Sequence, residues 1–173
     1  MFPRKYVPTQ LSREDKTLQL KALKKSKRDY LEGKYSVREK IKSFKSKPSR
    51  HVVQAKKIYN ITNIKPSRIL AKKTGCKISV LKEIEAKGMG AYYSGGSRPS
   101  QTAHSWGRAR LASAISGGKA AAVDYKILGG GCNRGSIALK LAKRAKQKHG
   151  YGQRRVPKVK NHLKRDNTSN QSK

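Results

Sequence analysis

Positive charge is the feature that most limits what this chain of 173 residues can fold into. The chain carries 43 Lys and Arg residues against 9 Asp and Glu, which gives a formal net charge of +34. Like charges repel one another in a compact fold, whereas a polyanion attracts them. We therefore expect a partner with negative charge, either nucleic acid such as DNA or the anionic surface of an inner membrane.

The charge is lowest in the middle of the chain. Residues 1–65 carry +14, residues 66–128 carry +8 and residues 129–173 carry +12. From Gly88 to Asp124 the sequence is rich in Gly, Ala and Ser and has few large side chains. This pattern predicts a mainly α protein with a small helical core flanked by extended or disordered basic arms. The expected parts are a basic N-terminal arm with one helix (1–48), a compact helical core (49–128), and a basic C-terminal helix with a disordered tail (129–173).

The hydrophobic content of 35% is small for this length, so parts of the chain are expected to order only on a partner. No apolar run approaches the roughly 18 to 20 residues that cross a bilayer, and the first residues lack the apolar stretch of a signal peptide. We expect no transmembrane span. Cys76 and Cys132, 56 positions apart, match neither a disulfide framework nor a zinc motif, which predicts free thiols in a reducing compartment.

Capping residues mark several helices. Ser12, followed by Asp15, predicts a helix that runs to about Gly33, and its narrow apolar stripe among many lysines predicts a solvated helix or one that lies on a partner. Residues 35–48 have the composition of a basic linker. Three glycines, 129–131, are typical of a flexible joint. Further helices are expected over residues 50–60, 103–115, 119–128 and 136–148.

Residues 66–88 have the spacing of a helix-turn-helix. Ser67 predicts the start of the first helix, Gly75 its end, and Gly88 the end of a second helix that begins near Val80. The second helix would turn Cys76, Leu81 and Ile84 inward and Lys77, Ser79, Lys82 and Glu83 outward. The corner either reads DNA or is a common packing unit. Its two carboxylates, Glu83 and Glu85, favour packing because they repel phosphates.

The segment GMGAYYSGGSR, from Gly88 to Arg98, predicts a tight turn with an anion contact at Arg98, without the order of residues of a P-loop. The aromatic residues here could stack on bases, but the shortage of large side chains favours a place in the core. The candidate protein-contact core is therefore Tyr92, Tyr93, Trp106, Leu111 and Ile115. The candidate nucleic-acid or anion contacts are Lys77, Ser79, Lys82, Arg98, Arg108, Lys140, Lys143, Arg144, Arg154 and Arg155.

Catalytic patterns are weak. None of the four histidines, His51, His104, His149 and His162, has a catalytic or metal-binding spacing. A set made of His104, Ser105 and Asp124 can be imagined, but adjacent residues on a helix point in different directions. We expect no enzyme activity, no cofactor, no metal and no small-molecule substrate.

The motifs GAYYS, GSRP, QTAHSWG, ARLASAI, GGKA and AVDY carry a resemblance that covers about Tyr6 to Leu128. In them the chain resembles a family of small basic proteins of large double-stranded DNA viruses of algae and protists, the phycodnavirus and mimivirus group. It departs from that pattern at Gly95, Ser100 and Lys126, where Ser, Asn and His are expected. The resemblance implies a structural component of the virion, present in the host cytoplasm or nucleus during assembly, and it transfers no activity.

Two roles in a virion suit these features. One is a minor capsid protein beneath the outer shell, which bridges other capsid proteins and the anionic inner components. The other is a DNA-binding nucleoprotein that condenses the genome with its basic arms and the helix-turn-helix-like corner. The small-residue, low-charge centre favours the capsid role, because it suggests specific protein contacts. A ribosomal or other RNA-associated protein is a third interpretation.

Overall fold

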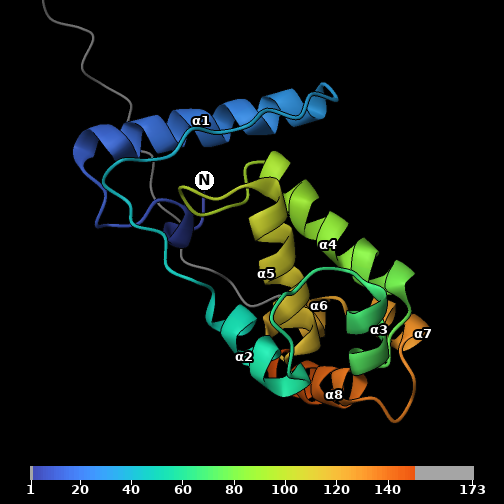
Figure 1. Cartoon of the computed structure of the whole chain (residues 1–173). Helices are drawn as coiled ribbons and strands as arrows, with labels where there is room; N and C mark the ends of the chain where they lie inside the picture. Colours follow the sequence, from blue (N-terminus) through green and yellow to red (C-terminus); the bar gives the residue numbers. More distant parts are fainter. Residues whose placement is uncertain (1, 151–173) are drawn as a thin grey trace, which may run out of the picture.

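The chain folds mainly into α-helices, as the sequence predicts. The computed structural model describes residues 2–150, and this part contains eight α-helices, one 3-10 helix and no strand. The elements, shown in Figure 1, are η1 (Arg4–Tyr6), α1 (Arg13–Leu31), α2 (Arg50–Tyr59), α3 (Arg68–Thr74), α4 (Ile78–Tyr93), α5 (Ala103–Ile115), α6 (Lys119–Val123), α7 (Tyr125–Gly131) and α8 (Ile137–His149). None of these helices combines the length and hydrophobicity needed to cross a bilayer.

The main core surrounds α5, which lies between α4, α2, α6 and α8 (Figure 1). Leu81, Ile84, Leu111 and Ile115 are fully buried there. The rest of this core is rich in alanine, contributed mainly by α5, α6 and α8. Alanine side chains fill little space, so these short helices pack close together around α5.

Helix α1 packs on a second, smaller core. Its Leu20 and Leu23 are buried with Val7, Leu11 and Ile41, while Lys and Arg occupy much of its exposed surface. The Ser12 hydroxyl accepts the Asp15 N–H at 3.1 Å, which confirms the predicted cap. The expectation of a solvated or partner-bound helix is therefore corrected, because segments on both sides of α1 cover its apolar stripe.

The crossing of α4 and α5 depends on two glycines. A Cβ atom on Gly88 would lie 2.6 Å from the Cα atom of Gly107, and one on Gly107 would lie 2.8 Å from the carbonyl oxygen of Glu85. The predicted end of the helix at Gly88 is wrong: α4 continues to Tyr93. Gly88 serves close packing within a helix, and the chain turns later, where Gly95 has a φ of 80°.

Two further boundaries differ from expectation. The helix predicted over 119–128 is divided at Asp124 into α6 and α7. The three glycines predicted to be a joint form the last turn of α7. The helix starts at Ser67, Thr102 and Ser136 are confirmed, since each side chain accepts a backbone N–H of the helix that follows. The cap expected at Ser49 is wrong, because its side chain accepts no backbone N–H of α2.

The segment predicted to be a linker, 35–48, is anchored by Arg38. Its guanidinium donates hydrogen bonds to the Ser26 hydroxyl (2.9 Å), the Tyr92 carbonyl (2.8 Å) and the Ser97 hydroxyl. It also lies 3.8 Å from the centre of the Tyr92 ring. Burial lowers the pKa of Arg38 from its ordinary value. This one side chain therefore joins α1, the extended segment and the end of α4.

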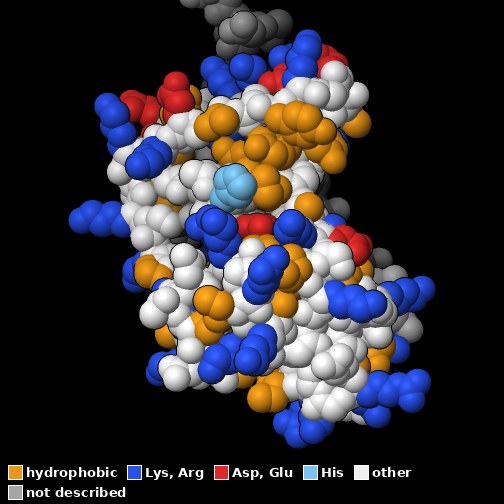
Figure 2. Space-filling model, turned by 45° about the vertical axis from the view of Figure 1, so that its right-hand side comes forward, with side chains coloured by type: hydrophobic (Ala, Val, Ile, Leu, Met, Phe, Trp, Pro, Cys, Tyr) orange, Lys and Arg blue, Asp and Glu red, His pale blue; other side chains and the backbone are white. Residues whose placement is uncertain are grey.

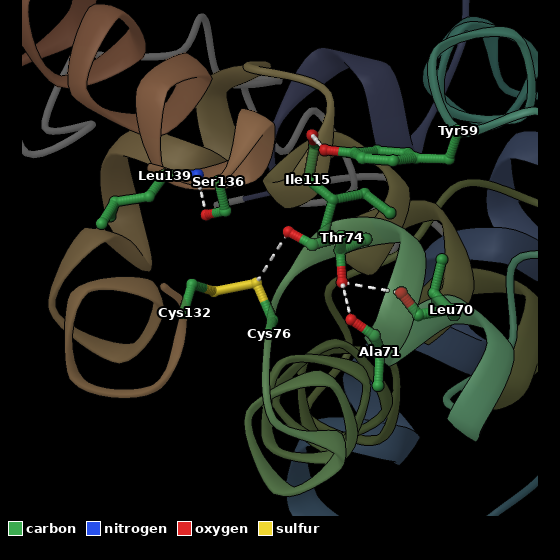
Figure 3. The surroundings of a disulfide bond; sticks show 9 residues. All are labelled: Tyr59, Leu70, Ala71, Thr74, Cys76, Ile115, Cys132, Ser136 and Leu139. Atoms are coloured by element: carbon green, nitrogen blue, oxygen red, sulfur yellow. Dashed lines mark hydrogen bonds between the residues drawn. A yellow bond between two sulfur atoms is a disulfide. The ribbon is translucent and has the colours of Figure 1, made fainter. Parts of the chain in front are cut away.

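A disulfide joins Cys76, at the corner between α3 and α4, to Cys132 after α7 (Figure 3). Two backbone hydrogen bonds flank it: the Lys77 N–H donates to the Gly131 carbonyl and the Asn133 N–H to the Gly75 carbonyl, both at 2.8 Å. The prediction of free thiols is therefore wrong. The two cysteines are 56 positions apart in sequence, and the path of α4 to α7 brings them together.

Candidate polyanion-binding surface

One end of the molecule is formed by four helices and contains no carboxylate side chain. We call it the basic end. It comprises residues 50–77 and 125–150, that is α2, α3, α7, α8 and their connections, and no Asp or Glu occurs among them. Figure 1 shows these helices on the side of the molecule away from α1. The C-terminal turn of α3 meets the start of α8, because a Cβ atom on Gly75 would lie 2.9 Å from that of Ser136.

Helix α8 gives the basic end its clearest face. Ala138, Ala142 and Ala145 are buried against the core, at the spacing of one helix face. Lys140, Lys143 and Arg144 are exposed, as predicted, and α8 contains no acidic residue. The small buried face holds the helix close to α5 and α6 and turns its cations to solvent.

The predicted contacts at the start of α4 lie beside this end. Lys77, Ser79 and Lys82 are exposed, as the helix-turn-helix pattern predicts, and Gly75 turns the chain with a φ of 69°. Glu83 is exposed as well, so the outward face of α4 has mixed charge. The corner exists, but its face is less favourable to phosphate than that of α8.

Two of the remaining predicted cations, Arg98 and Arg108, lie outside the basic end. Arg98 is exposed in the connection between α4 and α5, outside the basic end. Arg108 is half-buried, and its Nε lies 3.7 Å from the Glu85 carboxylate, which offsets its charge. Arg154 and Arg155 lie outside the residues that the structure describes.

The basic end also contains exposed cations that the sequence analysis did not single out: Lys56, Lys57, Lys72, Lys73 and Arg134. A sequence signal for the four lysines exists, because no acidic residue occurs between Lys40 and Lys82. Burial, and after it the charge of Arg50, lowers the pKa of His51 in α2. His51 therefore adds little positive charge to this end near neutral pH.

The predicted protein-contact core lies mostly inside the chain. Tyr92, Leu111 and Ile115 are buried and pack inside the chain, so a partner protein would not reach them. Tyr93 and Trp106 are half-buried. Trp106 makes an edge-to-face contact with Tyr6 at a ring distance of 6.0 Å.

Asp124 is buried and fully occupied by two cations. Both its oxygens accept hydrogen bonds from Arg110 at 2.8 Å, and the Lys87 ammonium lies 3.1 Å away. Ser105 completes the capping box of α5 with Thr102, and His104 is exposed. Ser105 and Asp124 therefore have separate partners, and Asp124 ties α4 and α5 to the junction of α6 and α7. Residues 2–150 contain no cluster of three or more His, Cys, Asp or Glu side chains that could hold a metal ion.

One protein-family model matches residues 3–127, and its description is a family of unknown function (DUF5824). No curated protein and no solved structure matches the chain. The matched residues include the α4–α5 crossing and Asp124. They end before α8, so the cations of this helix lie outside the match.

Proposed function

We propose that this chain, which belongs to the DUF5824 family of unknown function, is a non-catalytic nucleic-acid-binding protein that contacts the phosphate backbone with its basic end. One observation supports this function. Residues 50–77 and 125–150 contain no carboxylate side chain, and they contribute exposed Lys and Arg from several helices. Elsewhere, exposed acids such as Glu14, Glu32 and Glu83 lie among the cations.

An acid-free cationic surface suits a backbone of regular negative charge. Each Lys or Arg that neutralises a phosphate releases condensed counterions, so several such contacts acting together make affinity high and steeply dependent on salt. Contacts of this kind carry no sequence information. The proposed function is therefore sequence-independent packaging or coating of nucleic acid.

The test compares two triple substitutions that remove the same charge. Lys140→Gln, Lys143→Gln and Arg144→Gln neutralise the face of α8, whereas Lys21→Gln, Lys24→Gln and Lys25→Gln neutralise exposed positions of α1. The dissociation constant for a DNA duplex is measured over a range of salt concentrations, and circular dichroism verifies the fold of each variant.

The α8 variant should lose affinity, and its slope of log affinity against log salt should be smaller by about 2 to 3 units, at roughly 0.9 per phosphate contact. The α1 variant should keep most of the wild-type slope. Equal losses in the two variants would mean that net charge alone causes binding, and the basic end would then have no special role.

A virion setting is part of the proposal, because the resemblance to proteins of large double-stranded DNA viruses supports it. The disulfide is in keeping with this setting, since disulfides persist in particles outside the reducing cell interior. In such a particle the protein would coat or organise the genome.

A minor capsid role is the second candidate. The small residues that favoured it in the sequence, Gly88 and Gly107, are used in packing α4 on α5. What favours it in the fold is the exposure of two apolar side chains, Leu31 and Val37, at 79% and 81%. Stripping particles in stages separates the two roles: a protein that leaves with the DNA core supports the first, and one that stays with the shell supports the second.

A further inference from the structure

Three tyrosines from distant parts of the chain meet at the surface, and we call them the tyrosine patch: Tyr30 at the end of α1, Tyr35 after it, and Tyr93 at the end of α4. The ring centres of Tyr30 and Tyr35 are 6.0 Å apart, and those of Tyr35 and Tyr93 are 5.0 Å apart, both edge to face. The buried Tyr92 continues the series beneath Tyr93 at 5.4 Å. Figure 2 shows apolar side chains gathered near the upper end of the molecule, with Lys and Arg as well as Asp and Glu side chains above them.

Tyr35 is both exposed and held in position. It is 65% exposed and Tyr30 is 38% exposed, whereas Tyr92 is 1% exposed. Tyr35 lies between two other rings, and three residues later Arg38 fixes the backbone through its hydrogen bonds to Ser26 and Tyr92. A ring held in this way loses little conformational freedom when a ligand covers it. The patch therefore has the properties of a preformed aromatic platform.

The charge around the patch narrows the choice of ligand. Lys27, Arg28 and Lys34 are exposed nearby in the sequence, as are Glu32 and Glu39, and the ammonium of Lys34 pairs with Glu32 at 2.9 Å. With a net charge of +34, the chain selects for polyanions. Among polyanions, unpaired nucleic acid also offers flat aromatic faces, whereas a duplex stacks its bases on one another.

We propose that the tyrosine patch stacks on the bases of single-stranded nucleic acid, with Tyr35 as its principal contact. This inference rests on the proposed function, because the cations bring the strand to the protein. The tyrosines then favour a strand with unpaired bases over a sugar-phosphate backbone that has none. Patch and basic end lie at opposite ends of the molecule, since α1 and the end of α4 are remote from α8 in Figure 1. A strand that reaches both would bind more tightly than at either end alone.

The test uses two strands of equal length and charge, an oligothymidylate and an abasic strand that has the sugar-phosphate backbone without bases. Wild type should bind the oligothymidylate about tenfold or more tightly than the abasic strand, as expected for stacking on aromatic side chains. Tyr35→Ala should abolish this preference without changing the affinity for the abasic strand. Tyr35→Phe, which keeps the ring, should retain the preference, and Tyr35→Leu, which keeps only apolar area, should lose it.

The outcomes separate this inference from the proposed function. Tight, salt-dependent binding of both strands with equal affinity would overturn the stacking role and leave the basic end as the nucleic-acid contact. Absence of binding to either strand at physiological salt would overturn both. If Tyr35→Leu behaved as wild type, or if Tyr35→Ala lost binding to phosphatidylserine vesicles with no change on the strands, the patch would be an apolar docking site for a protein or a lipid surface.

Discussion

Gly88 and Gly107 determine how closely α4 and α5 approach. Each lies inside a helix, where glycine usually costs about 1 kcal/mol relative to alanine. That cost is offset because a side chain at either position would collide with the backbone of the other helix. Close approach also places Arg110 of α5 and Lys87 of α4 around the buried Asp124.

Gly88→Ala should therefore destabilise the protein although alanine is the better helix former. The added methyl would lie 2.6 Å from the Gly107 Cα and 3.0 Å from the Arg110 Cβ. Overpacking of this kind costs about 1 to 3 kcal/mol, which exceeds the gain of roughly 1 kcal/mol in helix propensity. Urea unfolding followed by circular dichroism measures the change in the free energy of unfolding.

Gly129→Ala is the matched control, because Gly129 lies in α7 with no atom within 4 Å of an added Cβ. It should stabilise the protein by about 0.5 to 1 kcal/mol through helix propensity alone. If Gly88→Ala stabilised the protein as Gly129→Ala does, the close approach of α4 and α5 would not depend on glycine.

At the scale of elements, the sequence predicts those helix ends that depend only on neighbouring residues. Ser12, Ser67 and Ser136 cap their helices as expected, because a cap needs only a hydroxyl and the N–H groups that follow it. Glycine is harder to interpret from local sequence. Gly75 ends α3 with a positive φ, whereas Gly88 lies inside α4, and the two differ through their tertiary neighbours, which a local pattern does not contain.

The candidate binding residues also include some that the sequence predicts and some that it does not. The exposed cations of α8 follow from the periodicity of one helix, so Lys140, Lys143 and Arg144 could be predicted. The tyrosine patch is assembled from α1, the segment after it and α4, so no short window of sequence contains it. The pairing of Cys76 with Cys132 likewise depends on the route of the helices between them.

The disulfide should stabilise the attachment of α7 and α8 to the corner between α3 and α4. For cysteines 56 positions apart, the chain-entropy model gives a contribution of about 4 kcal/mol to the free energy of unfolding. Reduction, or the paired substitution Cys76→Ser and Cys132→Ser, should lower the urea midpoint accordingly. Hydrogen exchange should also become faster at the N–H groups of Lys77 and Asn133, which bridge the same two segments.

The reductant should have no effect on the serine variant, which provides the control. A wild-type protein with the same urea midpoint before and after reduction would show that the two backbone hydrogen bonds and the alanine packing of α8 hold this junction without the covalent bond.

At the scale of the whole molecule, the fold holds a large excess of charge with few internal pairs. Asp124 is the one fully buried acid among residues 2–150, and it takes up Arg110 and Lys87. Most other cations are exposed and remain close to further cations, above all at the basic end. The molecule is therefore expected to be strained by its own charge until a polyanion or salt screens it.

Added salt should consequently raise the thermal unfolding midpoint of the isolated protein. The screening length falls from about 30 Å at 0.01 M to about 8 Å at 0.15 M, so repulsion across the molecule weakens over this range. Each kcal/mol gained should raise the midpoint by roughly 2 to 4 °C for a chain of this size. The variant with Lys21, Lys24 and Lys25 changed to Gln removes three exposed charges from α1, so it should start from a higher midpoint at low salt and gain less. A midpoint that fell on adding salt would mean that ion pairs such as Arg110 with Asp124 outweigh the repulsion, and that the fold does not need a polyanion to relieve it.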